Sequence, residues 1–360
     1  MATSKLTSEE VMSSFETEDT VEQVPPADIV AYNELRSCAD LFRLHASGKL
    51  DIQPDFQRDV VWKQDDQTRF IDSLVKQLPI PSMCFSLDYK TQKWKVIDGL
   101  QRMSSIIRFL SPAPWKLSNL PDIRPELRGS SNLELKAGTD AQSRLFSLVE
   151  DVSIPVTVIR CDYSQRSHMR YLFTIFHRLN SGGVRLTNQE IRNCIFSGPF
   201  NDMLKEFDKS KEWKSITRRV WGSMDRFRSV EVALRVLAFG DELESYDGNL
   251  ARFLNDYMQR RHTEAGPALQ DTRQRLADLA SVAEPVLGGG RFKMPLALVE
   301  ATLVGMYVNI EVLKLRNAQE IRLAFESMKK SPTFSESARY AVSSAENVQV
   351  RLLEAISAFE

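Results

Sequence analysis

The chain has 360 residues, of which 42% are hydrophobic and 26% charged, and its 47 Lys and Arg residues balance its 48 Asp and Glu residues. This length and composition predict a globular protein of two domains and exclude a polycation that binds nucleic acid along its whole length. Any nucleic-acid surface must therefore be local.

The cysteines and the N-terminal segment indicate in which cellular compartment the protein lies. The four cysteines form no CxxC pair and three lie in apolar runs, so we expect packing roles rather than a metal site, in a reducing environment. The first twenty residues are acidic and rich in Ser and Thr, unlike a signal peptide, and no apolar run has the length of a membrane span. We expect a cytoplasmic protein without a membrane partner.

The first elements follow from local patterns. Residues 1–26 are expected to form a flexible acidic arm that ends at Pro25-Pro26. The leucine spacing of residues 33–50 predicts a helix that Gly48 ends. A helix over residues 64–78 and a β-hairpin over 82–98 follow, and a helix over 101–110 packs back on the hairpin.

The rest of the chain changes character near residue 199. Residues 111–152 read as an insertion with a helical end, 154–160 as a strand and 164–180 as a helix. Thr187 and Glu190 form a capping box for the next helix, and only helical periods follow. The predicted class is α+β: an arm (1–26), a mixed α/β domain (27–198) and an all-helical domain (199–360).

The stretch VIDGLQR, residues 96–102, places four polar or flexible residues where a strand meets a helix. A helix N-terminus can hold a phosphate, Gly99 allows a tight turn with close backbone approach, and Arg102 offers a planar charged fork. Gln101 can donate to a phosphate or orient water, and Asp98 can hold hydrated Mg²⁺ or accept a proton. The structural alternative stays open: Asp98 caps the helix, and Gln101 and Arg102 are solvated first-turn residues.

Two further stretches suggest parts of the same site. In PDFQRDVVW, Gln57 and Arg58 form a second Gln-Arg pair, which is economical if both pairs face one polyanionic ligand. In FHRLNSGGVRLTNQEIRNC, a turn joins two helices, either as a ligand-facing loop or as an ordinary connection with glycine at the helix end. The turn residues are Asn180, Ser181, Gly182 and Gly183.

In order and spacing, PDFQRDVVW, LPIPSMCFSL, VIDGLQRMSSIIRFL and FHRLNSGGVRLTNQEIRNC resemble the N-terminal domain family of GmrSD-type restriction endonucleases, over about residues 30–200. The resemblance implies a ParB/sulfiredoxin-like core that binds and hydrolyses NTP. The family motif Asp-Gly-Gln-Gln-Arg matches Asp98, Gly99, Gln101 and Arg102, and the upstream Gln-Arg matches Gln57 and Arg58. Leu100 replaces the first Gln of the motif. This change is harmless if Leu100 points into the core, and otherwise it puts hydrolysis in question.

The resemblance implies a function in defence against foreign nucleic acid. It points to an NTP-binding protein with slow NTPase activity, which acts as a nucleotide-gated sensor or regulatory component of a bacterial restriction or antiphage system. The implied ligands and partners are an NTP of unidentified base, Mg²⁺ at Asp98, DNA, and a nuclease or other defence protein. We expect no HNH nuclease domain, because His262 is the only histidine of the second half.

Two other functions stay open. The chain can be a noncatalytic DNA- or protein-binding module that has lost turnover, or a nuclease that uses the ParB-like core itself. Residues 205–228 interleave Lys and Arg with Trp213, Trp221 and Phe227. This pattern is typical of a nucleic-acid surface if the aromatic rings are exposed, and of ordinary packing if they belong to the core.

Overall fold

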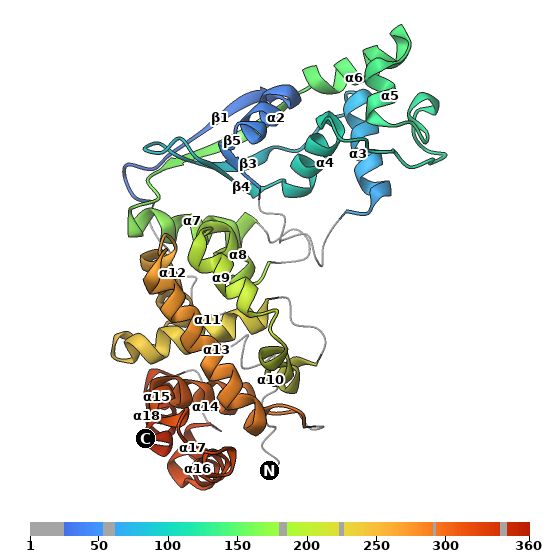
Figure 1. The fold of residues 1–360 in the computed structure, drawn as a ribbon. Coiled ribbons are helices and arrows are strands. Elements are labelled where there is room, and N and C mark those ends of the chain that lie inside the picture. Colours follow the sequence, from blue (N-terminus) through green and yellow to red (C-terminus); the bar gives the residue numbers. More distant parts are fainter. Residues whose placement is uncertain (1–24, 53–61, 180–185, 223–226, 291–292, 339–343) are drawn as a thin grey trace, which may run out of the picture. The chain divides into compact units, whose positions relative to one another are not determined.

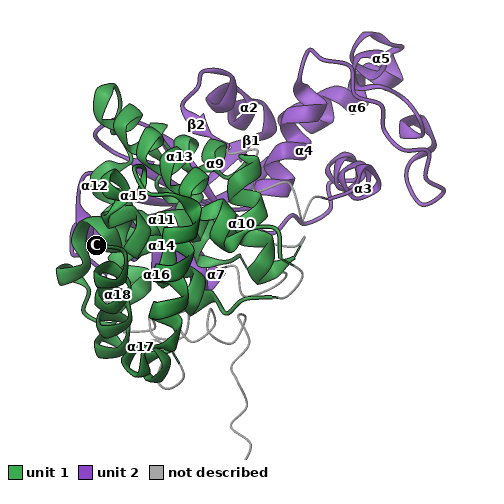
Figure 2. Cartoon of the chain, turned by 60° about the horizontal axis from the view of Figure 1, so that its bottom comes forward, with its two compact units in different colours: residues 1–22, 186–360 green, residues 23–185 purple. Residues whose placement is uncertain are grey.

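The computed structural model describes residues 25–52, 62–179, 186–222, 227–290, 293–338 and 344–360. The chain forms two compact units, and the boundary falls between residues 185 and 186 (Figure 2). The first unit in chain order, residues 23–185 (purple, labelled unit 2 in Figure 2), holds a mixed five-stranded sheet with helices. The second unit, from residue 186 on (green, labelled unit 1 in Figure 2), is helical in its described residues (Figure 1). The predicted α+β class is therefore confirmed.

The sheet has the strand order β1-β5-β3-β4-β2. Its strands are β1 (Val30–Ser37), β2 (Leu50–Asp51), β3 (Met83–Asp88), β4 (Trp94–Asp98) and β5 (Ser153–Cys161). Antiparallel pairing joins β1 to β5 and β3 to β4, whereas β3 runs parallel to β5 and β2 parallel to β4. The pair β3–β4 is the hairpin that the sequence predicts.

Helices bury one face of this sheet. The helices of the first unit are α2 (Cys38–Ala46), α3 (Gln64–Val75), α4 (Leu100–Leu110), α5 (Asn132–Ala137), α6 (Asp140–Asp151) and α7 (Arg166–Leu179), with a 3-10 turn at Pro125–Leu127. Residues of α2, α3, α4 and α6 form one buried core with Phe85, Val96 and Val156 from three strands. Since strand side chains alternate between faces, the residues next to these three point to the other face.

The first strand corrects one prediction from the sequence. The leucine spacing predicts a helix that already includes residues 33–37, but these residues lie in β1 and pair with β5. The helix α2 begins only at Cys38, where the Ser37 hydroxyl accepts a hydrogen bond from the Asp40 N–H at 3.1 Å. Leu35 is 71% exposed and therefore belongs to no buried helical face. Strand pairing overrides the local periodicity here.

The second unit consists of packed helices. They are α8 (Asn188–Ile195), α9 (Pro199–Phe207), α10 (Lys211–Trp221), α11 (Arg228–Glu242), α12 (Leu250–Arg261), α13 (Pro267–Leu287), α14 (Leu296–Val308), α15 (Ile310–Leu313), α16 (Ala318–Lys330), α17 (Pro332–Ser337) and α18 (Ala345–Phe359), with a 3-10 turn at Leu243–Ser245. No helix within the described ranges combines the length and the apolar character that crossing a membrane requires.

The two tryptophans of α10 belong to the core of this unit. Trp213 is fully buried and Trp221 is 8% exposed, and the Trp213 indole donates to the Ser229 carbonyl at 3.2 Å. Neither ring is therefore available to stack on a nucleobase. The hypothesis that Trp213 and Trp221 belong to a nucleic-acid surface is therefore wrong, because both lie on the buried face of the amphipathic helix α10.

Candidate functional site

A left-handed glycine joins β4 to α4. Gly99 has φ 96° and ψ 16° and is the N-cap of α4. A Cβ at this position would lie 2.6 Å from Cγ of the buried Met83, so both the backbone conformation and the packing require glycine. The tight turn that the sequence predicts is present, and the close approach that it permits is to Met83. Because Gly99 occupies the N-cap position, Asp98 is not the capping residue.

A β-bulge turns Asp98 away from the core. Cys84 pairs with Asp98, whereas the next residue of β3, Phe85, pairs with Val96, so Ile97 is an extra residue in β4. Strict alternation would place Asp98 on the same face as Val96, inside the core. The bulge moves Asp98 to the opposite face, beside Cys84, where its side chain is 41% exposed.

Arg102 is bound to groups of its own chain. Its Nη2 forms an ion pair with Asp98 Oδ2 at 2.8 Å and donates to the Ser82 carbonyl at 3.4 Å, while Nη1 donates to the Pro81 carbonyl. Burial lowers the pKa of Arg102 and the charge of Asp98 opposes this shift, but the guanidinium remains protonated at any physiological pH. The side chain is only 14% exposed. Arg102 therefore holds Asp98 and residues 81–82 together.

Leu100 and Gln101, the two residues between Gly99 and Arg102, have different surroundings. Leu100 is half-buried and packs against the hydrophobic core. Its effect on hydrolysis stays a prediction. The Gln101 side-chain oxygen accepts a hydrogen bond from the Trp62 N–H at 3.2 Å. This bond fixes the chain at Trp62, directly after residues 53–61.

The other predicted site residues lie outside the described residues. They are Gln57, Arg58, Asn180, Ser181, Gly182 and Gly183. Their part in a ligand site stays a prediction. The described candidates Asp98, Gly99, Gln101 and Arg102 lie together at the β4–α4 junction.

A pocket of about 300 Å³ lies beside Asp98. The sheet and the residue before β3 line it with Ala31, Ser82, Met83, Cys84, Asp98, Thr157 and Ile159. α7 lines it with Tyr171, Ile175 and Leu179, which recur every fourth residue and so share one face of the helix. Three stretches singled out in the sequence, around residues 82–84, 98 and 179, therefore meet at one pocket.

The polar side chains of the pocket are already ordered. The Thr157 hydroxyl donates to Asn33 Oδ1 at 2.8 Å and lies 3.3 Å from the Ser82 hydroxyl, which also donates to the Met83 carbonyl at 3.1 Å. Burial, with a contribution from Asp98, raises the pKa of the Cys84 thiol to about 12. Cys84 is therefore a neutral wall residue rather than a nucleophile.

Hydrogen bonds at its start fix α7, the helical wall of the pocket. The fully buried His168 accepts a hydrogen bond at Nδ1 from the Asp162 N–H at 2.9 Å, so its other nitrogen carries the proton and donates to Asp28 Oδ1 at 2.9 Å. The buried Asp162 carboxylate forms an ion pair with Lys90 at 2.7 Å and accepts from the Ser164 N–H at 2.9 Å. These contacts set the position of α7 against the sheet.

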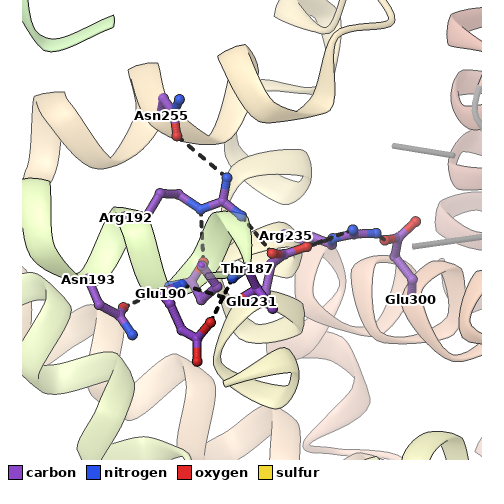
Figure 3. Close-up of polar contacts among 9 residues, drawn as sticks. Thr187, Glu190, Arg192, Asn193, Glu231, Arg235, Asn255 and Glu300 are labelled. Carbon is purple, nitrogen blue, oxygen red and sulfur yellow. Dashed lines mark hydrogen bonds and ion pairs between the residues drawn. The ribbon is translucent and has the colours of Figure 1, made fainter. Parts of the chain in front are cut away.

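In the second unit, a buried charge network joins three helices (Figure 3). Arg192 of α8 pairs with Glu231 of α11 at 2.6 Å, and Glu231 also pairs with Arg235 at 2.7 Å. Arg235 pairs in turn with Glu300 of α14 at 2.8 Å. Burial alone would raise the pKa of Glu231, but the two guanidinium groups outweigh burial and hold the pKa below its ordinary value. Within the described residues, no group of His, Cys, Asp and Glu side chains has the arrangement of a metal site.

Sequence reasoning did not identify the walls of the pocket. A signal exists in α7, where Tyr171, Ile175 and Leu179 form a second apolar stripe beside the buried Leu172 and Phe176. When one apolar stripe of a helix packs in the core, a second stripe is available to line a pocket. The strand residues gave no comparable signal, because their meeting depends on the order of strands in the sheet.

Comparison with protein families places this site in a known domain. Residues 38–197 match the family described as GmrSD restriction endonuclease, N-terminal domain, while comparisons with curated proteins and with solved structures found no match. The matched range includes the β4–α4 junction, α7 and α8, and α8 begins at the predicted capping box of Thr187 and Glu190. Residues 38–197 therefore form a domain of the family of GmrSD restriction endonuclease N-terminal domains.

Proposed function

We propose that this chain is a cytoplasmic NTP-binding protein with slow NTPase activity, which serves as a nucleotide-gated sensor or regulatory component of a bacterial restriction or antiphage system. Family membership supports the defence setting. The observation that carries the nucleotide site is the bulge that brings Asp98 out of the core and beside a pocket. A bulge interrupts strand pairing, and bulges recur next to active sites, where they redirect a side chain.

In this proposal the phosphates lie against the first turn of α4. The helix start supplies a partial positive charge, and Asp98 would hold a hydrated Mg²⁺, which would neutralise negative charge on the phosphates. Arg102 holds the Asp98 carboxylate in place through their 2.8 Å ion pair. Arg102 is thus a positioning residue, and Gln101 secures the neighbouring segment at Trp62.

The test is phosphate release from ATP, GTP, CTP and UTP with Mg²⁺, with and without DNA. The wild type is compared with Asp98→Asn, which keeps the shape of the side chain and removes its charge. We expect slow release by the wild type and a loss of about a hundredfold or more in the variant, the size of effect typical when one group that stabilises developing charge is removed. Equal release by both proteins would refute the assignment of Asp98.

One observation favours a second candidate function, a noncatalytic DNA- or protein-binding module. The Arg102 fork already binds Asp98 and the carbonyls of Pro81 and Ser82, so it stabilises the junction without any ligand. Stoichiometric nucleotide binding without phosphate release would support a module of this kind. Divalent-dependent DNA cleavage that Asp98→Asn abolishes would instead support a nuclease in this domain.

A further inference from the structure

The pocket beside Asp98 has the size of one ring system. Its volume of about 300 Å³ is at the lower end of the range for small-molecule sites, roughly 300–1,000 Å³. A nucleobase matches this volume, whereas a complete nucleoside triphosphate exceeds it. α4 begins two residues after Asp98, so a base in the pocket leaves its phosphates within reach of the proposed phosphate site.

Most of the pocket wall is apolar. The strands contribute Met83 and Ile159, and α7 contributes Ile175, Leu179 and the aromatic side chain of Tyr171. Leu179 is 47% exposed. A ligand that covers these side chains removes apolar surface from water, and a flat aromatic ring does so with both of its faces. The wall therefore suits a planar ring and not a phosphate.

Three polar side chains of the pocket, Ser82, Thr157 and Asp98, offer lone pairs rather than hydrogens, whereas the Tyr171 hydroxyl on α7 can donate as well as accept. A hydroxyl has one hydrogen, and Thr157 gives its hydrogen to Asn33. Ser82 gives its hydrogen to the Met83 carbonyl or to Thr157. Asp98, ion-paired with Arg102, is a carboxylate and only accepts. A ligand group that donates hydrogen bonds is therefore favoured beside these three side chains, and a group that only accepts meets other acceptors there.

We infer that this pocket holds the base of the bound nucleotide and prefers bases that carry an exocyclic amino group. The inference rests on the proposed function, because the phosphates must bind at the start of α4. Cytosine has an amino group where uracil has a carbonyl, and guanine has an amino group that hypoxanthine lacks. The amino member of each pair finds an acceptor, whereas the carbonyl of uracil leaves two acceptors facing each other.

The test compares dissociation constants of CTP, UTP, GTP, ITP and inorganic tripolyphosphate with Mg²⁺, measured on the full chain by calorimetry. All four nucleotides should bind more tightly than tripolyphosphate, because only they fill the pocket. CTP should bind more tightly than UTP, and GTP more tightly than ITP, by roughly three- to tenfold, which corresponds to one hydrogen bond.

Three variants assign these differences to the pocket. Thr157→Val keeps the side-chain shape and removes the hydroxyl. The ratio of the affinity for CTP to the affinity for UTP should therefore fall toward one. Ala31→Phe, in the exposed part of β1, fills the pocket and should weaken nucleotide binding to the level of tripolyphosphate without changing tripolyphosphate itself. Val30→Phe is the matched control, because neighbouring strand residues point to opposite faces, and it should leave all constants unchanged.

The outcomes separate this inference from the proposed function. Nucleotides that bind more tightly than tripolyphosphate in the wild type, and equally well in Ala31→Phe, would overturn the pocket assignment and leave the phosphate site standing. Equal affinities for CTP and UTP in the wild type would overturn the amino preference. If neither tripolyphosphate nor any nucleotide binds, the proposed function fails, and this inference fails with it.

Discussion

At the scale of single residues, Gly99 is required both by its left-handed backbone and by close packing against Met83. Gly48 has only the first of these requirements and therefore serves as a comparison. Gly48 also has a positive φ, 65°, but a Cβ there meets nothing within 4 Å, whereas a Cβ at Gly99 lies 2.6 Å from Met83. Gly48→Ala should therefore lower the free energy of unfolding by about 1 kcal/mol, the cost of the left-handed conformation alone. Gly99→Ala adds overpacking of a buried side chain and should cost about 2–5 kcal/mol in total.

Urea unfolding of both variants checks this prediction. Because both glycines belong to the first unit, the two changes report on the same cooperative structure. Similar losses for Gly48→Ala and Gly99→Ala would mean that Met83 yields to the new methyl group. In that case, packing against Met83 would not explain why glycine occupies position 99.

Asp162 should make the stability of the first unit depend on pH. Burial pushes the pKa of this carboxyl up, but the bonds from Lys90 and Ser164 outweigh burial and hold the pKa below its ordinary range. A depressed pKa in the folded state contributes stability above the unfolded value of about 3.9, and this contribution is lost as the pH falls toward the folded value. The stability difference between wild type and Asp162→Asn should therefore shrink below about pH 4.

The check is the free energy of unfolding of both proteins from pH 6 to pH 2.5. Asp151→Asn removes the same charge from an exposed position of α6 and serves as the control for net charge. A constant difference between wild type and Asp162→Asn across this range would show that the ion pair with Lys90 contributes no pH-dependent stability.

At the scale of elements, the packing of α8 against α11 depends on charges that water does not reach. The side chain of Glu231 is 5% exposed and forms ion pairs with both Arg192 and Arg235. Glu231→Gln keeps the size and removes the negative charge, which leaves two buried guanidinium groups without their shared carboxylate. The free energy of unfolding should fall by about 3–5 kcal/mol, the usual cost of removing one partner of a buried ion pair.

An exposed pair in the same unit provides the comparison for Glu231. Glu206 of α9 pairs with Lys209 at 2.9 Å, and both side chains are more than half exposed. Glu206→Gln should therefore leave the stability nearly unchanged, because water screens an exposed ion pair. Denaturant unfolding of the two Glu→Gln variants tests whether burial, and not the ion pair as such, determines the effect.

The sequence was sufficient to predict elements that depend on neighbouring residues alone. The hairpin β3–β4, the helix α4 and the capping box of α8 follow from alternation, spacing and capping residues, and each is present. The misassigned residues 33–37 and the bulge at Ile97 depend instead on which strand pairs with which, and at what register. The sequence identified Asp98, but only the register places it beside Thr157 and Tyr171 in one pocket.

At the scale of the whole molecule, the chain forms two compact units. The buried cluster of the sheet domain lies entirely within residues 38–158, and the network around Glu231 lies entirely after residue 186. A domain with its own core can unfold as a unit of its own. A change in one core should therefore lower the stability of that unit alone.

Hydrogen exchange followed by mass spectrometry tests this independence with two of the variants above. Gly99→Ala should speed exchange in peptides from β3, β4 and α4 and leave those from α11 and α14 unchanged, whereas Glu231→Gln should do the reverse. Acceleration in both units by either variant would mean that the units unfold together. The proposed nucleotide gating would then have a direct route between the site at Asp98 and the helical unit, because any ligand that stabilises one unit would also stabilise the other.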